Sequence, residues 1–244
     1  RTLKGHRGVL DPHDVEAAIR PADIHQPRTS LICIENTHNR AGGTAVTPRQ
    51  IESINEVAKK YGIGLYMDGA RIFNAAVALQ VDPKQLTQHV DNLMFCLSKG
   101  LSAPIGSLVV GSSDFIEKAR RIRKMLGGGM RQAGVIAAPG IIALEKMVDR
   151  LREDHDNARR LADGLAKIDR ISIDLPSVQT NIVIFDVSGL NMTGTQFTDQ
   201  LERHGVKALD YGGHLVRMVT HRGIEREDVS RALEAVKQIA EESD

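Results

Sequence analysis

The chain has 244 residues, 41% of them hydrophobic, which is enough to bury the core of one large domain or of two small ones. Its formal net charge of +1 gives no electrostatic reason to expect binding to nucleic acid or to a membrane surface. No run of about eighteen apolar residues could span a bilayer, and the start of the chain lacks the apolar stretch of a signal peptide, so we expect a cytosolic protein.

The first predicted elements are a strand, a helix and a second strand. Residues 31–35 are apolar and short, as in a buried strand. Thr47 followed by Gln50 predicts a capped helix start, and apolar residues at helical spacing continue to Gly62, which predicts the helix end. Residues 63–67 are then predicted to form the next strand.

Two further strands are predicted at 93–97 and 107–110. Because strands and helices alternate, we expect an α/β domain with a mostly parallel sheet that is covered on both faces. Ligands of such sheets bind beyond the carboxyl ends of the strands. Asp68 and Lys99 both follow predicted strands directly, so they are candidates for a site at that edge.

The second half of the chain has a different pattern. A helix with Ser113 as its cap is predicted at 113–126; its basic run lacks interleaved aromatic residues, which argues against nucleic-acid binding. We expect a large domain over 1–150 and a smaller C-terminal α+β domain over 151–244. The predicted elements are a helical region over 132–167, strands at 171–174, 180–187 and 214–219, and helices at 194–204 and 225–241.

The two cysteines, Cys33 and Cys96, lie far apart in apolar runs. This pattern is typical of buried free thiols. Neither a CxxC pair nor His/Cys spacing typical of metal ligands is present, so we predict no metal site.

Asp68 and Lys99 carry the functional interpretation. A lysine can hold an aldehyde as a Schiff base if burial or nearby cations keep its amine neutral, and the apolar strand before Lys99 predicts partial burial. A buried carboxylate such as Asp68 can hold a protonated ring nitrogen. Together they indicate a pyridoxal 5'-phosphate (PLP) enzyme. Taken singly, Lys99 could instead extend from a strand end, and Asp68 could cap the next segment or pair with Arg71.

Two arginines are candidates for binding anionic groups. Arg71 follows Asp68 by three residues and could grip a carboxylate with two parallel bonds or bond the phenolic oxygen of the cofactor. Arg131 follows the glycines at 127–129 and is predicted to open a helix with Gln132, a setting that favours a phosphate. The glycines could alternatively be only a hinge.

Two further residues are candidates for contacting a substrate. His38 lies in a polar cluster directly after the strand at 31–35, and it could act as a general base or hold a substrate hydroxyl. Arg217 lies inside an apolar strand and therefore needs a partner. That partner could be a substrate carboxylate or a structural ion pair.

Taken together, these segments resemble the low-specificity L-threonine aldolases. The resemblance runs through most of the chain, and the order of many segments makes it specific where no single segment would. The segments that carry it are residues 35–39, 68–74, 97–101, 104–107, 127–132, 153–155 and 217–221.

The resemblance implies a fold-type-I PLP enzyme of the aspartate aminotransferase superfamily. It implies Lys99 as the Schiff-base lysine and Asp68 as the partner of the pyridine nitrogen. Arg71 would contact the cofactor and the substrate carboxylate. Arg131 would reach the cofactor phosphate from a neighbouring subunit, since family members are usually homotetramers with shared sites.

The implied substrates are L-threonine, L-allo-threonine and similar β-hydroxy amino acids, cleaved to glycine and an aldehyde such as acetaldehyde. Arg217 would bind the substrate carboxylate, and His38 would lie near the substrate hydroxyl. This activity would place the protein in amino-acid metabolism, in threonine catabolism and glycine biosynthesis.

One departure keeps alternatives open. Family members have a longer N-terminal portion, with an aromatic or histidine residue that stacks on the cofactor and a glycine-threonine turn for its phosphate, and neither can be placed before Arg1. For a molecule that starts at Arg1 we expect weak PLP binding and little activity. The alternatives are another fold-type-I activity, β-elimination or racemisation, and an inactive remnant without its N-terminal portion.

Overall fold

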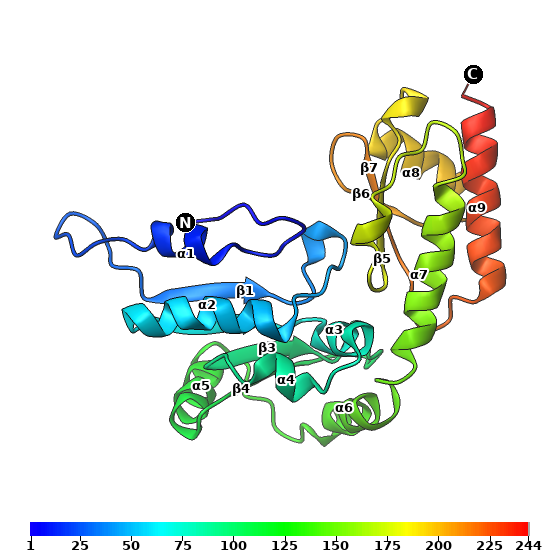
Figure 1. Ribbon diagram of the computed structural model, residues 1–244. Coiled ribbons are helices and arrows are strands. Elements are labelled where there is room, and N and C mark those ends of the chain that lie inside the picture. Colours follow the sequence, from blue (N-terminus) through cyan, green and yellow to red (C-terminus); the bar gives the residue numbers. More distant parts are fainter. Residues whose placement is uncertain (244) are drawn as a thin grey trace. The chain divides into compact units, whose positions relative to one another are not determined.

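The computed structural model describes residues 1–243, which form two compact units (Figure 1). Unit 1 comprises Arg1–His38 and Ala45–Asp149; unit 2 comprises Asn39–Thr44 and the chain from Arg150 onward. The sequence pattern did not predict that the short segment Asn39–Thr44 belongs to unit 2. Among the described residues, no helix is both long enough and apolar enough to cross a membrane.

Unit 1 is built on a four-stranded sheet in the order β1-β2-β3-β4. Its strands are β1 (Leu31–Glu35), β2 (Gly64–Asp68), β3 (Asn92–Cys96) and β4 (Ser107–Gly111), each within one residue of its prediction. The first three strands are parallel and β4 is antiparallel to β3, so the predicted mostly parallel sheet is confirmed.

Six α-helices accompany this sheet in the described part of unit 1, including three that the sequence pattern did not predict: α1, α3 and α4. The helices are α1 (Pro12–Ala18), α2 (Pro48–Tyr61), α3 (Ile72–Leu79), α4 (Pro83–Thr87), α5 (Ser113–Met125) and α6 (Gly134–Lys146). The cap of α5 is Ser112, whose side chain accepts from the Phe115 amide, and not Ser113 as predicted.

The helix α2 begins and ends as its sequence predicts. The Thr47 hydroxyl accepts from the Gln50 amide at 3.4 Å, and Gln50 Oε1 accepts from the Thr47 amide at 2.8 Å, which completes the capping box. Gly62 closes the helix with a left-handed φ of 62°. A glycine is favoured there because a Cβ atom is disfavoured in this backbone conformation.

Only one face of the sheet is tightly packed. Ile32, Leu65 and Met67 point to the face covered by α2 and are buried with it in one apolar cluster. On the opposite face Cys33 pairs in register with Tyr66, and Cys33 is exposed. The predicted burial of Cys33 is therefore wrong, because alternate strand residues point to opposite faces and the Cys33 face is less tightly packed.

The second cysteine also differs from its prediction. Cys96 is half-buried, at the last position of β3, where it pairs with Ser107 of β4. Both thiols are free. An apolar run predicts a strand well, but it does not tell which neighbours cover each side chain.

Unit 2 is an α+β arrangement, as predicted. Its antiparallel sheet has the order β5-β7-β6, with β5 (Ile182–Asp186), β6 (Leu209–Asp210) and β7 (Leu215–Val219). Its core is closed by an edge-to-face contact of Phe185 and Phe197, whose ring centres are 5.9 Å apart. Its helices are α7 (Leu151–Leu165), α8 (Gly194–Arg203) and α9 (Arg226–Glu241).

Two elements predicted between residues 132 and 174 differ from the structure. The helical region expected over 132–167 is two helices, since α6 ends at Lys146 and α7 begins at Leu151. No glycine or proline lies between them, so the sequence carries no breaker signal. The strand expected at 171–174 is a single bridge between Ser172 and Asp186. Short 3₁₀ turns occupy Asn39–Ala41, Leu175–Ser177 and Ser188–Leu190.

Candidate functional site

Asp68 and Lys99 lie at the carboxyl ends of two neighbouring parallel strands. Asp68 is the last residue of β2 and pairs in register with Met94 of β3. Lys99 follows the end of β3 at Cys96 by three residues. This agrees with the placement expected from the sequence, and it puts both residues at the edge where ligands of parallel sheets bind.

The carboxylate of Asp68 is held through one oxygen only. Oδ1 accepts a hydrogen bond of 3.0 Å from the Ala70 amide, and the Asp68 carbonyl accepts one of 2.8 Å from the Asn36 amide. Within residues 1–243, no hydrogen bond to the second carboxylate oxygen is seen. Asp68 therefore has a fixed orientation and an acceptor available for a protonated ring nitrogen.

Gly69 allows the two strand ends to meet closely. Its amide donates to the Met94 carbonyl at 2.8 Å, which continues the β2–β3 pairing past Asp68. A Cβ atom built on Gly69 would lie 2.9 Å from the same Met94 oxygen, closer than real Cβ contacts. A larger residue would therefore push Asp68 away from β3.

Lys99 is exposed, which corrects the expectation of partial burial. The chain turns away from the sheet after β3: the Leu97 amide donates to the Gly106 carbonyl at 2.9 Å, and the Lys99 carbonyl accepts from Ser102 at 2.9 Å. The turn fixes the backbone of Lys99 while its amine stays accessible to an incoming aldehyde.

His38 lies on the same side of unit 1 as Asp68. Its Nε2 atom is 3.8 Å from Glu35 Oε2, and both side chains are about one-third exposed. Glu35 is in turn the register partner of Asp68 in β1–β2. The imidazole also packs on Gly8, since a Cβ atom there would lie 2.4 Å from His38 Cγ.

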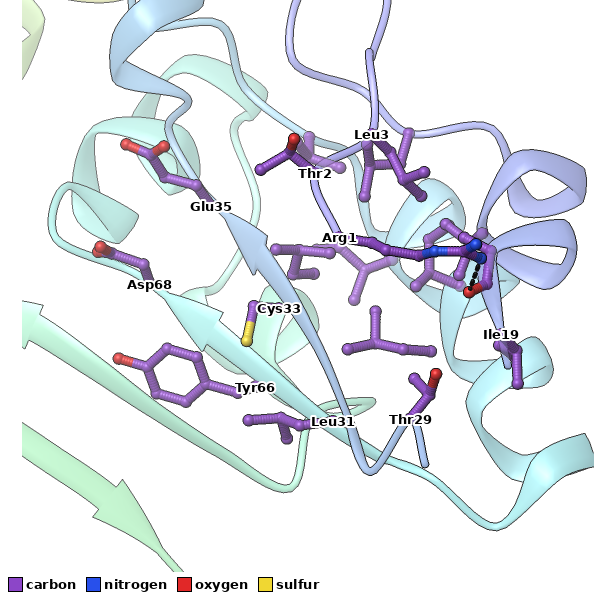
Figure 2. Close-up of a pocket in the computed structure, with 18 of the residues that line it drawn as sticks. Arg1, Thr2, Leu3, Ile19, Thr29, Leu31, Cys33, Glu35, Tyr66 and Asp68 are labelled. Carbon is purple, nitrogen blue, oxygen red and sulfur yellow. Dashed lines mark hydrogen bonds between the residues drawn. The ribbon is translucent and has the colours of Figure 1, made fainter. Parts of the chain in front are cut away.

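A cavity of about 650 Å³ lies in unit 1, against β1 and β2 (Figure 2). Glu35, His38 and Asp68 are among its lining residues, as are Cys33 and Tyr66. Lys99, Arg71 and Arg131 are not among its lining residues.

Cys33 and Tyr66 were not singled out from the sequence as residues of this cavity. The alternation of side chains along a strand could have identified them, because it puts Cys33 on the same face as Glu35 and Tyr66 on the same face as Asp68. Neighbouring atoms partly desolvate the Cys33 thiol although the residue is exposed, and this desolvation raises its pKa. Burial, with smaller contributions from Asp68 and Cys33, raises the pKa of Tyr66. Both groups are therefore neutral near pH 7.

The two candidate arginines of unit 1 differ in their surroundings. Arg71 is half-buried and occupies the cap position at the start of α3, directly after the Asp68 turn. Arg131 is exposed, and α6 begins only at Gly134, so the prediction that Arg131 opens a helix is wrong. Gln132 has a left-handed φ of 49°, which interrupts the chain before the helix.

Arg217 belongs to unit 2, in the central strand β7, and is only 8% exposed. Its Nη2 atom donates to Asn39 Oδ1 at 3.0 Å, and its guanidinium lies 5.8 Å from the centre of the Tyr211 ring. Burial lowers the pKa of Arg217. No carboxylate pairs with it in the part of the chain that the structure describes, which favours an anionic ligand over a structural ion pair.

The geometry thus brings together four of the six predicted site residues at the carboxyl ends of β1–β3: Asp68, Lys99, His38 and Arg71. Arg131 follows later in unit 1, and Arg217 is a feature of unit 2.

Comparisons with known proteins identify the family of the chain. The family model described as beta-eliminating lyase matches residues 1–188. The chain is 42% identical to the probable low-specificity L-threonine aldolase 2 of Arabidopsis thaliana, over 98% of this chain and 68% of that protein. It is 40% identical to the low specificity L-threonine aldolase of Escherichia coli strain K12, over 91% of this chain and 64% of that protein.

A solved structure described as Leishmania major threonine aldolase shares the fold. Its TM-score is 0.78 at 20% identity, and the match covers 98% of this chain and 70% of that one. The chain thus spans about two thirds of the proteins that it resembles.

Proposed function

Because the chain belongs to the beta-eliminating lyase family and, within it, to the low-specificity L-threonine aldolases, we propose that it cleaves L-threonine, L-allo-threonine and similar β-hydroxy amino acids to glycine and an aldehyde. Threonine would release acetaldehyde. The observation that supports this most directly is the position of Asp68 and Lys99 at the carboxyl ends of adjacent parallel strands.

PLP fits the residues present. When bound, it supplies an electron sink for the electrons left on Cα after cleavage. The available carboxylate oxygen of Asp68 would keep a proton on the ring nitrogen, and the accessible amine of Lys99 would hold the aldehyde group. Arg71, at the end of the Asp68 turn, would contact the cofactor and the substrate carboxylate.

Two residues would act on the substrate itself. His38, beside Glu35 and on the Asp68 side of the sheet, would hold the β-hydroxyl and accept its proton. Arg217 would bind the carboxylate, a role supported by its burial and by the lack of a carboxylate partner among the described residues of unit 2. Fixing the carboxylate helps to orient the bond that breaks.

The alternatives are a β-eliminating or racemising activity and an inactive remnant. The aldolase names of the curated relatives do not favour them. An assay with L-threonine separates the activities, because cleavage gives glycine, β-elimination gives a keto acid and racemisation gives only the epimer at Cα. A cytoplasmic location and a role in glycine biosynthesis and threonine catabolism stay predictions.

We also propose that the chain assembles with copies of itself, as a tetramer with shared sites. Large apolar side chains are exposed on and after α5, among them Ile122, Met125, Leu126, Met130 and Val135. Exposed apolar patches of this kind typically mark interfaces. Arg131 lies within this segment and is exposed, which supports its proposed role toward a phosphate in a neighbouring subunit.

Light scattering tests the assembly. We expect the double variant Met125→Asp/Leu126→Asp to lower the oligomer mass, whereas Ile24→Asp, at a residue that is 96% exposed in unit 1, should leave it unchanged. A monomeric wild-type chain would contradict the proposal.

The decisive experiment for the cofactor is borohydride reduction of the PLP-treated chain, followed by intact mass and peptide mapping. We expect one PLP-sized adduct on Lys99. The variant Lys99→Ala should lose it, and Lys59→Ala, which removes an exposed lysine of α2, should keep it. An adduct spread over several lysines, or none, would contradict the assignment of Lys99.

A further inference from the structure

We infer that Tyr211 is a second substrate-binding residue, whose hydroxyl donates a hydrogen bond to the same carboxylate that Arg217 binds. The inference rests on the proposed function for the identity of the ligand, an amino acid. It is carried by independent observations within unit 2, where two buried polar atoms of neighbouring side chains have no hydrogen-bond partner among the described residues.

The first observation concerns Arg217. The residue is 8% exposed, and its Nε atom is buried without a hydrogen bond from any described residue, although Nη2 is bound to Asn39. A buried donor without a partner costs free energy that a bound acceptor recovers. The guanidinium therefore has an open position for an acceptor from outside the chain.

The second observation concerns Tyr211. Its hydroxyl is buried and, within residues 1–243, likewise has no hydrogen-bond partner. The Arg217 guanidinium carbon lies 5.8 Å from the centre of the same ring. Two unpartnered donors in neighbouring side chains suit a ligand with two adjacent acceptor atoms, which is the chemistry of a carboxylate.

The charge around the ring supports an anion. Arg40, which is exposed, also lies 5.8 Å from the ring centre, so two cations border Tyr211. Among the described residues no carboxylate pairs with either guanidinium. A carboxylate bound between Arg217 and the hydroxyl would supply the missing negative charge.

The backbone holds Tyr211 in place before a ligand arrives. The Tyr211 amide donates to the Leu215 carbonyl at 2.9 Å, which ties it to β7. Asp210 anchors the turn, since it accepts from the Gly212 amide at 2.8 Å and from Thr195 Oγ1 at 2.7 Å. A donor fixed in this way loses little conformational entropy on binding, so it contributes fully to affinity.

The chain is suited to a direct spectroscopic test, because it has three tyrosines and no tryptophan. In the full chain labelled with 3-fluorotyrosine, the signal that disappears in Tyr211→Phe identifies Tyr211. Glycine and glycinamide, which lacks the carboxylate, are the probes, used with and without PLP. We expect glycine to shift the Tyr211 signal to saturation and glycinamide to leave it in place, with Tyr61 of α2 as the internal reference.

Kinetics provide the second measurement. We expect Tyr211→Phe to raise KM for L-threonine about tenfold, as expected for one hydrogen bond to a charged group, and to leave kcat within about twofold. Tyr61→Phe should change neither value. A fall in kcat as large as the rise in KM would mean that Tyr211 is merely structural and would overturn the inference. Equal loss of affinity for glycine and for glycinamide in Tyr211→Phe would overturn it too.

The two proposals can fail separately. If glycine shifts the Tyr211 signal but the chain does not cleave L-threonine, the carboxylate site stands and the aldolase proposal fails. If the chain cleaves L-threonine and the Tyr211 signal does not respond to glycine, the inference fails and the aldolase proposal stands.

Discussion

Arg150 and Asp154 form a two-point ion pair at the start of α7, with Nη2 2.6 Å from Oδ1 and Nη1 3.1 Å from Oδ2. The Asp154 side chain is fully buried, and its backbone carbonyl accepts a 2.6 Å hydrogen bond from Thr220 Oγ1. Thr220 directly follows β7, the strand that carries Arg217. The ion pair therefore fixes the start of α7. The hydrogen bond from Thr220 then ties the end of β7, the strand of Arg217, to that helix.

We expect Asp154→Ala to lower the free energy of unfolding by about 3 kcal/mol, because it leaves the half-buried Arg150 guanidinium with only the exposed Glu153 carboxylate, 3.7 Å from Nη2. Denaturant unfolding followed by circular dichroism measures this. The double variant Arg150→Met/Asp154→Leu is the matched control and should recover most of the loss, since it removes both charges. An Asp154→Ala protein as stable as wild type would show that the pair contributes nothing.

Stability should fall in mildly acidic solution because of His155. Burial lowers the pKa of His155 from 6.5 to about 4, with Asp156 opposing the shift. Above pH 6.5 both folded and unfolded states hold a neutral imidazole, so His155 does not lower the free energy of unfolding. Between pH 6.5 and about 4 only the unfolded state takes up the proton, which destabilises the fold by at most about 3 kcal/mol.

Chemical denaturation at pH 7.5 and pH 5 tests this, with His155→Gln as the variant and His25→Gln, at an exposed loop position, as its control. We expect the difference in unfolding free energy between the two pH values to shrink in His155→Gln and to persist in His25→Gln. An unchanged difference in both variants would assign the acid sensitivity to other groups.

Gly8 should be far less replaceable than Gly62, although both have positive φ values, 79° and 62°. A Cβ atom at Gly8 would lie 2.4 Å from His38 Cγ, whereas at Gly62 it would meet nothing within 4 Å. Gly62→Ala should cost only the backbone strain of about 1–2 kcal/mol. Gly8→Ala should cost clearly more and should also lower threonine cleavage, because the His38 ring must move. Parallel unfolding curves and rate assays on the two variants decide this.

The contribution of the α2 capping box to the free energy of unfolding should be measurable without changing the candidate site. Thr47→Ala removes the acceptor for the Gln50 amide and should cost about 1 kcal/mol. Thr47→Ser keeps a hydroxyl and should stay within about 0.5 kcal/mol of wild type. Denaturation midpoints at a constant denaturant slope give both values; equal midpoints for the two variants would argue that the cap contributes nothing.

Asp68→Asn should lower aldol cleavage by about 100-fold or more, because an amide cannot keep a proton on the cofactor ring nitrogen. Asp91→Asn is the matched control: Asp91 accepts from the Leu65 amide at 2.7 Å and lies at the opposite end of β2. It should stay within a few-fold of wild type. Rates with L-threonine at saturating PLP measure both, and a fully active Asp68→Asn chain would remove Asp68 from the mechanism.

Local signals in the sequence predicted most of the regular structure. The strands of unit 1 and the capped helix α2 were predicted within one residue, because alternation and capping depend on near neighbours in the chain. Short helices such as α4, with five residues, were missed, since so few residues show no clear period. The break between Lys146 and Leu151 was missed because no glycine or proline marks it.

The sequence by itself determined which residues end the strands of the parallel sheet, and so it singled out Asp68 and Lys99. Only the tertiary structure decided what surrounds each side chain: Lys99 and Cys33 are exposed, and Arg217 is buried beside Tyr211 with Asn39 as its partner. Strand ends follow from local periodicity along the chain. Burial and partners depend on segments far apart in sequence, such as Asn39 and Arg217, which no local pattern brings together.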